Sequence, residues 1–237
     1  MQLNLAAVQL GTRALGPGRR AVVWVQGCPF RCAGCVAPDW IAREQAHLVS
    51  VAELARRILA DPGIDGLTFS GGEPMLQAAA LAELAGAVRS ERDVSVICFT
   101  GYTLRRLRDN PPGRPGVADL LAATDLLIDG RYVAGRDDGV GLRGSSNQRL
   151  HHLTGRLAGH ADLGTAPRRV EVYVAGDQAL MVGVPAHGML EAFHRAFPGP
   201  AGSSTYAAQD VVLEGPGPTE PVLDESAHRR AAGAGAR

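Results

Sequence analysis

Three of the four cysteines lie on one short segment, where three residues separate Cys28 from Cys32 and two separate Cys32 from Cys35. Each thiolate can bind one iron of a [4Fe–4S] cube, which leaves the fourth iron without a protein ligand. A metal with an open coordination position is suited to chemistry, whereas a fully ligated metal is structural or transfers electrons. The segment therefore predicts a [4Fe–4S] centre that can bind and reduce a small molecule.

A structural zinc site is the competing interpretation of these cysteines. Such a site usually needs a second pair of Cys or His ligands, and His47 is the nearest candidate for a fourth ligand. His47 lies in a polar stretch without zinc-finger spacing, and chance clustering of three among four cysteines is a weaker alternative still. Cys98 lies in an apolar run, so we expect it to be a small buried hydrophobic residue.

A second motif, residues 70–74 (SGGEP), follows a run of strand-forming residues. In parallel α/β folds, ligands bind at the carboxyl ends of the strands. Glycines there let backbone amides and carbonyls approach a ligand closely, and the carbonyls could receive the ammonium group of an amino acid. Taken alone the motif favours a structural turn, but its position one strand–helix unit after the cysteines favours a ligand site.

The elements that must position these motifs alternate along the chain. Strands are predicted at residues 21–25, 66–70, 94–99 and 126–129. A capping pattern at Ser50 and Glu53 begins one helix, which Asp61 ends, and apolar residues from Leu81 to Val88 mark the next. This order predicts an α/β fold with parallel strands, which an open sheet or a partial barrel would satisfy equally.

The remainder of the chain has a different pattern. Residues 131–147 are rich in Gly, Asp, Arg and Ser and predict a long ordered loop. Residues 169–174 and 180–184 predict a hairpin with its turn at Gly176 and Asp177. A helix is expected from about Met189 to Phe197, and the Pro-, Gly-, Ala- and Ser-rich residues after 198 predict a flexible tail.

Composition excludes several classes of function. The 24 basic and 24 acidic residues balance, so no overall charge points to nucleic acid or to a membrane surface. The chain contains no Lys, which removes Schiff-base chemistry. No apolar run is long enough to cross a bilayer and the N-terminus lacks the pattern of a secretory signal, so we expect a cytoplasmic protein with reduced thiols.

The motifs together resemble the radical S-adenosylmethionine superfamily and, within it, the glycyl-radical activases of anaerobic ribonucleotide reductase. The resemblance covers about residues 14–155. It rests on this series, in order: residues 16–18 (GPG), 26–28 (QGC), 32–35 (CAGC), Trp40, 70–74 (SGGEP), 100–102 (TGY), 127–130 (LIDG) and 143–148 (RGSSNQ). The string from Leu142 to Gln148 is specific to the subgroup.

The resemblance implies a partial (βα) barrel as the core domain, at residues 1–155. The sequence pattern after it predicts a hairpin-and-helix extension at 156–197 and a flexible tail at 198–237. It implies a [4Fe–4S] cluster on Cys28, Cys32 and Cys35 and reductive cleavage of S-adenosylmethionine to a 5′-deoxyadenosyl radical. The partners it implies are a glycyl-radical enzyme as protein substrate and a flavodoxin or ferredoxin as electron donor. The implied cofactor contacts are Gly34, Cys35, Val36, Gly71, Gly72 and Glu73.

Two departures from the family pattern stand out. Val36 occupies a position where close relatives often carry an aromatic residue. Residues 156–237 extend beyond the compact activases, and they motivate an alternative in which the enzyme acts directly on a peptide or small metabolite. A third, non-enzymatic hypothesis is an iron–sulfur or zinc module for electron transfer or docking.

Several other polar and aromatic residues admit two interpretations each. Trp40 and Tyr102 could wall the site or belong to the core, and Asp129 could face the site or form a turn. Arg143 and Asn147 could contact the substrate or tie their loop to the sheet. A surface location is expected for the adjacent pair His151 and His152 and for the run Arg105, Arg106 and Arg108.

Overall fold

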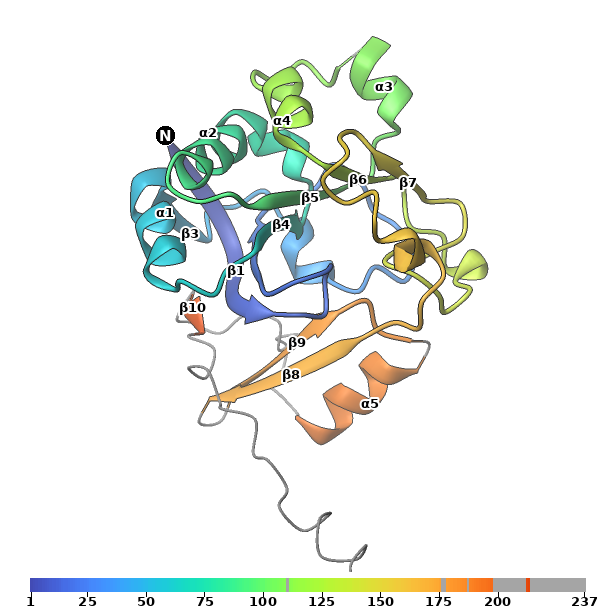
Figure 1. Ribbon diagram of the computed structural model, residues 1–237. Helices are drawn as coiled ribbons and strands as arrows, with labels where there is room; N and C mark the ends of the chain where they lie inside the picture. Colours follow the sequence, from blue (N-terminus) through green and yellow to red (C-terminus); the bar gives the residue numbers. More distant parts are fainter. Residues whose placement is uncertain (110, 176–177, 187, 198–211, 214–237) are drawn as a thin grey trace, which may run out of the picture.

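The computed structural model describes residues 1–109, 111–175, 178–186, 188–197 and 212–213 (Figure 1). Within these ranges eight strands form one sheet, ordered β10-β1-β2-β4-β5-β6-β7, with β3 paired to β1. The strands are β1 (Gln2–Thr12), β2 (Arg20–Val25), β3 (His47–Ser50), β4 (Gly66–Gly71), β5 (Ser95–Thr100), β6 (Leu126–Asp129), β7 (Arg149–His152) and β10 (Val212–Leu213).

The central strands β2, β4, β5 and β6 run parallel, and helices connect them. β1 and β7 flank this group in antiparallel pairing. The helices are α1 (Val51–Ala60), α2 (Ala78–Arg89), α3 (Leu104–Asp109) and α4 (Val117–Ala123), with short 3-10 turns η1 (Pro38–Ile41), η2 (Pro74–Gln77), η3 (Ala134–Arg136) and η4 (Ala161–Gly164). The predicted α/β class and the four predicted central strands are confirmed.

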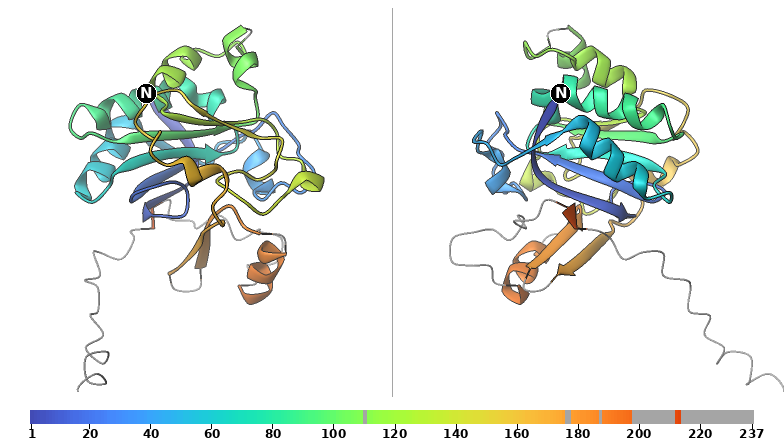
Figure 2. Two further views of the ribbon diagram at one scale, coloured as in Figure 1. Left: turned by 45° about the vertical axis from the view of Figure 1, so that its right-hand side comes forward. Right: turned by 90° about the vertical axis from the view of Figure 1, so that its left-hand side faces the viewer.

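The two faces of the sheet bury different sets of side chains because successive residues of a strand point to opposite sides. Leu67 and Phe69 of β4 belong to the core beneath α1, α2 and α4, and Figure 2 shows these helices on one side of the sheet. Ile97 of β5 and Ile128 of β6 belong to a second core on the other side. Each central strand is therefore covered on both faces, which explains its nearly continuous apolar sequence.

Helix α1 begins as the capping pattern predicts, but only half of the capping box forms. The Ser50 hydroxyl accepts a hydrogen bond from the backbone N–H of Glu53. The Glu53 carboxylate pairs with Arg56 and Arg57 instead of reaching back to Ser50. Asp61 ends the helix, as expected.

At the amino ends of the parallel strands, Arg20 is completely buried. Its guanidinium donates to the Thr68 hydroxyl at 2.7 Å, the Ser95 hydroxyl at 3.0 Å and the Pro17 carbonyl at 3.0 Å. Burial lowers the pKa of Arg20 to about 9. The opposite ends of the same strands carry the cysteine segment and the Gly71–Gly72 turn, so Arg20 closes the end of the sheet away from them.

The chain beyond β7 forms the hairpin β8 (Val170–Ala175) and β9 (Gln178–Gly183), followed by α5 (Met189–Ala196). The predicted hairpin and helix are confirmed, whereas the predicted turn at Gly176 and Asp177 lies outside the described residues. Of the predicted tail, only Val212 and Leu213 are described, and they pair with Val8 and Gln9 of β1. No helix in the described part of the chain is both long and apolar enough to span a membrane.

Candidate functional site

The cysteine segment leaves the carboxyl end of β2 and is fixed near its start. The backbone N–H of Gly27 donates to the carbonyl of Trp40 at 2.9 Å, and that of Cys28 to the carbonyl of Ile41 at 3.1 Å. Gly27 has a φ of 95°, a conformation that favours glycine. The residues after the third cysteine, folded into η1, therefore return beside the first one and close the segment into a loop.

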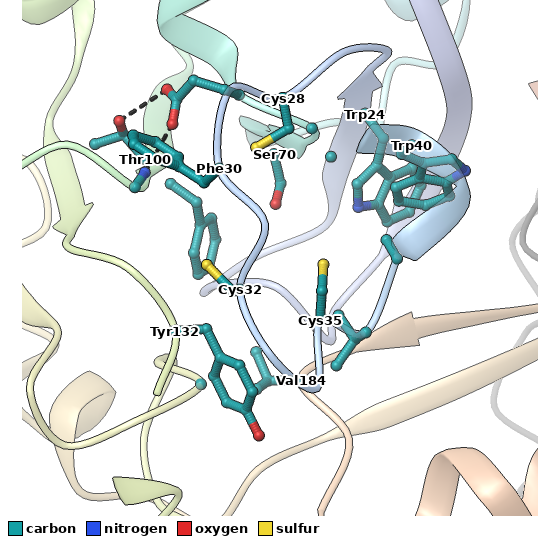
Figure 3. Close-up of a pocket in the computed structure, with 18 of the residues that line it drawn as sticks. Trp24, Cys28, Phe30, Cys32, Cys35, Trp40, Ser70, Thr100, Tyr132 and Val184 are labelled. Carbon is teal, nitrogen blue, oxygen red and sulfur yellow. Dashed lines mark hydrogen bonds between the residues drawn. The ribbon is translucent and has the colours of Figure 1, made fainter. Parts of the chain in front are cut away.

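The three thiols of this loop line one pocket, which has about 1230 Å³ of empty space, part of it open to solvent. Figure 3 shows the sulfur atoms of Cys28, Cys32 and Cys35 around one part of the pocket. All three residues are partly exposed, whereas Cys98 is completely buried in β5 on the helix-covered side of the sheet. The structure thus brings the three predicted ligands together and confirms Cys98 as a core residue.

Burial disfavours the ionised form of two of the three thiols in the metal-free chain. Burial raises the pKa of Cys28 to about 11 and also raises the pKa of Cys35. Iron must therefore displace protons when it binds, as thiolate ligation to a metal requires.

The zinc interpretation requires a fourth ligand close to the three thiols. In the described part of the chain, no three His, Cys, Asp or Glu side chains converge closely enough to hold one metal ion. His47, the candidate fourth zinc ligand, lies on β3, paired with Leu5 of β1. A cube places its cysteines on separate irons, so its ligands surround a space instead of meeting at one point.

The Gly71–Gly72 turn packs directly against the start of the cysteine loop. The backbone N–H of Gly72 donates to the Val25 carbonyl, and that of Glu73 to the Gly27 carbonyl, both at 2.8 Å. A Cβ atom at Gly71 would lie 2.5 Å from the Val25 nitrogen, and one at Gly72 would overlap the Gly27 carbonyl. The two motifs are therefore interlocked, and side chains at these glycines would displace the loop that carries the thiols.

Glu73 is completely buried, and its carboxylate is turned toward the end of β5. It accepts hydrogen bonds from the Thr100 hydroxyl at 2.8 Å, the Gly101 N–H at 2.7 Å and the Met75 N–H at 2.9 Å. Burial raises the pKa of Glu73 to about 7, although these three hydrogen bonds lower it in part. The side chain thus joins the ends of two neighbouring strands, and the residue is part of the pocket lining.

Aromatic residues support the loop from two sides. The rings of Trp24 and Trp40 lie 5.8 Å apart, and both line the pocket. Tyr102 packs edge-on against Phe30 with ring centroids 4.8 Å apart, and the Arg131 guanidinium lies 4.4 Å above the Phe30 ring. Trp40 therefore belongs to the core and also lines the pocket. Tyr102 supports the loop by packing against Phe30. The position of Phe30 between two cysteines gave no separate signal in the sequence.

The loop at residues 131–147 is tied to the sheet through its own polar groups. Asn147 donates to the Arg131 carbonyl at 2.8 Å, and Gln148 donates to the Gly130 carbonyl at 2.7 Å. Arg143 pairs with Asp138 at 2.6 Å. These contacts favour the structural interpretation of Arg143 and Asn147, and they identify Gln148 as a further anchor of the subgroup motif.

Asp129 and the adjacent histidines differ from the simplest expectation. The Asp129 carboxylate is buried and accepts a hydrogen bond from the Leu104 N–H at the start of α3. His151 lies 3.0 Å from Asp129 and is partly buried, so only His152 is at the surface as expected. Asp129 therefore supports the structure behind the pocket instead of projecting into it.

Of the predicted cofactor contacts, Cys35, Val36, Gly71, Gly72 and Glu73 line the pocket. Gly34 has a φ of 72° and lies next to Tyr132 and Ala134 of the following loop. Sequence reasoning did not assign several other residues to the pocket: Phe30 of the cysteine loop itself, and Thr100, Gly101, Arg131, Tyr132, Met181 and Val184 from distant segments.

Comparison with known proteins agrees with this geometry. The model of the 4Fe-4S single cluster domain family matches residues 14–151. The chain is 34% identical over 148 residues to the anaerobic ribonucleoside-triphosphate reductase-activating protein of Vibrio cholerae, covering 59% of this chain and 91% of that relative.

Two further relatives delimit the matched region. The protein of the same name from Enterobacteria phage T4 is 32% identical over 143 residues, covering 57% of this chain and 85% of the relative. The pyruvate formate-lyase-activating enzyme of Staphylococcus epidermidis is 31% identical over 155 residues, covering 60% of this chain and 58% of the relative. The chain therefore belongs to the 4Fe-4S single cluster domain family and, within it, to the radical S-adenosylmethionine activases.

Proposed function

We propose that this chain is a radical S-adenosylmethionine enzyme that installs a glycyl radical on an anaerobic ribonucleoside-triphosphate reductase. The observation that carries the proposal is the pocket in which three thiols surround a common space beside the interlocked Gly71–Gly72 turn. The similarity to the Vibrio cholerae activating protein, over nine-tenths of its length, supports the choice of partner.

In this proposal Cys28, Cys32 and Cys35 hold a [4Fe–4S] cluster. When bound, the cluster supplies the electron that cleaves S-adenosylmethionine to methionine and a 5′-deoxyadenosyl radical, which takes one hydrogen atom from a glycine of the partner. Gly34, Cys35 and Val36 flank the cofactor, and the backbone of Gly71, Gly72 and Glu73 receives its amino-acid end. The Glu73 carboxylate positions that backbone, because its oxygens already accept three hydrogen bonds.

The same proposal extends to the architecture and the electron donor. The parallel strands β2, β4, β5 and β6 form the partial (βα) barrel of a core at residues 1–155. Residues 156–197 are an added unit, and residues 198–237 are a tail. Each turnover consumes one electron, and a flavodoxin or a ferredoxin is the donor that we propose.

The test is to mix the anaerobically reconstituted protein, a strong reductant and S-adenosylmethionine with the reductase of the same organism. We expect a glycyl doublet by electron paramagnetic resonance and one 5′-deoxyadenosine for each radical formed. A reductase deuterated at glycine should pass deuterium into the 5′-deoxyadenosine. Cleavage of S-adenosylmethionine without radical or label on the reductase would exclude it as the substrate.

A second candidate function has one observation in its favour. The extension after residue 155 lies beyond the residues that the family model matches. An enzyme that acts directly on a peptide or a small metabolite would use the same cleavage chemistry with a different hydrogen donor. In that case deuterium would enter 5′-deoxyadenosine from the metabolite and not from a partner protein.

A further inference from the structure

The C-terminal extension contributes part of the wall of the cysteine pocket. Met181 and Gly183 at the end of β9 line it, as do Val184 and Pro185 directly after. The family model ends at residue 151, so these residues come from a part of the chain that the model does not match. Figure 3 places Val184 on the same side of the pocket as Cys35 and Tyr132.

Arg168 holds this wall in place. Its side chain is only 3% exposed and pairs with Asp137 at 2.8 Å. The same guanidinium donates to the carbonyls of Arg143 at 2.8 Å, Gly144 at 3.0 Å and Pro185 at 3.2 Å. Because Asp137 and Gly144 also line the pocket, one buried cation joins its rim to the end of the hairpin.

Glu171, near the same open end of the hairpin, provides a second anchor. Its carboxylate accepts hydrogen bonds from the Thr12 hydroxyl at 2.5 Å, the Arg13 N–H at 3.0 Å and the Tyr173 hydroxyl at 2.6 Å. Leu180 and Val182 of β9 are buried in the core that also contains Trp24 and Trp40. The hairpin is therefore packed onto the site at two polar anchors and one apolar contact.

The charges at the pocket indicate what kind of substrate fits. Among its described lining residues, the charged side chains are Glu73, Arg131 and Asp137. Glu73 is hydrogen-bonded, Asp137 is paired with Arg168, and Arg131 lies over Phe30. The lining therefore has no cluster of positively charged side chains that could bind a phosphate group. Its apolar residues, such as Val36 and Val184, suit an uncharged peptide segment.

We propose that the extension is a specificity wall, in which Val184 and Pro185 contact the glycine-containing segment of the partner as it enters beside the cluster loop. The proposal rests on the proposed function and names its substrate class, an uncharged peptide segment with apolar neighbours. Val36, which lines the same pocket, is 39% exposed. Segments with bulky or charged residues next to the glycine are excluded by size and by the cost of desolvation.

The experiment compares Val184→Phe with Val172→Phe in the full-length protein with the partner reductase. Val172 lies on the same hairpin but is 46% exposed and outside the pocket lining, so it is the matched control. We measure glycyl radical by electron paramagnetic resonance and 5′-deoxyadenosine by chromatography. Val184→Phe should lower the radical formed per 5′-deoxyadenosine about 10-fold, the scale of a misfit in a specificity pocket, while the control should stay within about 2-fold of wild type.

The larger side chain in Val184→Phe could prevent the cluster from binding, and the iron content measures this. Val184→Ala tests the wall in that case. This variant should raise the KM for the reductase about 3- to 10-fold, since it removes apolar contact. The wall would be overturned if Val184→Phe left the radical formed per 5′-deoxyadenosine unchanged and Val184→Ala left the KM for the reductase unchanged. An equal loss of radical and 5′-deoxyadenosine in a Val184→Phe protein with full iron content would also overturn it.

The two proposals fail in different ways. A wild-type protein that forms the glycyl radical, with Val184 variants that behave like the control, contradicts only the wall. A wild-type protein that forms no radical on the reductase but transfers hydrogen from a phosphorylated nucleoside contradicts both the partner and the uncharged-peptide substrate.

Discussion

The core of the fold, which contains the residues that the family model matches, and the hairpin after it contact the site in different ways. In the core, backbone hydrogen bonds and glycines interlock the cysteine loop with the Gly71–Gly72 turn. In the extension, the side chains of Arg168 and Glu171 anchor the hairpin, and the backbone N–H groups of Gly141 and Leu142 donate to the carbonyls of Ala166 and Leu163. Backbone contacts fix the ligands of the cofactor, whereas side-chain anchors hold a wall that can change without disturbing them.

The largest effect should follow from replacing a cysteine of the loop that the core holds in place. Cys32→Ala leaves two thiols for the cluster, so we expect at least a ~100-fold loss of 5′-deoxyadenosine formation. Cys98→Ala is the control, since Cys98 is buried beneath the helices, and it should keep both the iron and the activity. Iron and sulfide content, visible absorption and product release are the measurements, and full activity in Cys32→Ala would refute the ligand assignment.

The second-largest effect concerns the extension and tests whether its hairpin can be destabilised separately from the core. Arg168→Gln removes the ion pair with Asp137. It should lower the free energy of unfolding by about 3 kcal/mol, as expected when one partner of a buried ion pair is removed. Amide hydrogen exchange should then become faster in β8 and β9 while β4 and β5 stay protected. Arg105→Gln, which removes an exposed ion pair with Asp109, should change neither. Simultaneous loss of protection in both regions would show that core and extension unfold as one unit.

A pH effect tests the carboxylate that joins β4 to β5. The pKa of Glu73 is raised from 4.5 to about 7, so the folded metal-free chain binds a proton that the unfolded chain releases. The resulting stability is fully present below about pH 4.5 and is lost as the pH rises through 7. Relative to Glu73→Gln, which imitates the protonated acid, wild-type stability should fall by up to ~1.4 kcal/mol per pH unit between pH 5 and 7.

Urea unfolding of the two metal-free proteins at several pH values provides this measurement. Glu83→Gln is the control, because Glu83 is partly exposed and pairs with the N-terminus. Parallel pH profiles for wild type and Glu73→Gln would mean that the carboxylate stays ionised in the fold.

The smallest effect lies far from both the site and the extension. Ser50→Ala removes the side-chain acceptor at the start of α1 and should destabilise the core by about 1 kcal/mol. Ser50→Asp restores an acceptor and should recover most of this loss. Equal unfolding midpoints for all three proteins would show that Ser50 contributes nothing as a cap.

Local sequence patterns predicted the parallel strands and the helices well, because each buried strand is a short apolar run that ends at a turn residue. β1 was missed although it is long, because its polar residues Gln9 and Thr12 are buried and obscure the pattern. β3 and β7 were missed because they are four-residue strands of mixed polarity that pairing with a neighbour stabilises.

The three cysteines and the Gly71–Gly72 turn were predictable because their chemistry lies in adjacent residues. The partners of Glu73 were not, since Thr100 is 27 positions away and the contact depends on how two strands align. The pocket wall at Val184 was missed for the same reason. The sequence predicted a hairpin, but its packing against the site depends on Arg168 and Glu171 meeting distant partners.

The backbone hydrogen bonds at the start of the cysteine loop affect how the protein should respond to the loss of its cluster in air. The N–H groups of Gly27 and Cys28 are held by the carbonyls of Trp40 and Ile41, contacts that involve no sulfur atom. A chain that loses its irons to air therefore keeps these backbone bonds, and only the stretch between them needs to be ordered again. We expect such a protein to recover by simple re-metallation, without passing through the unfolded state.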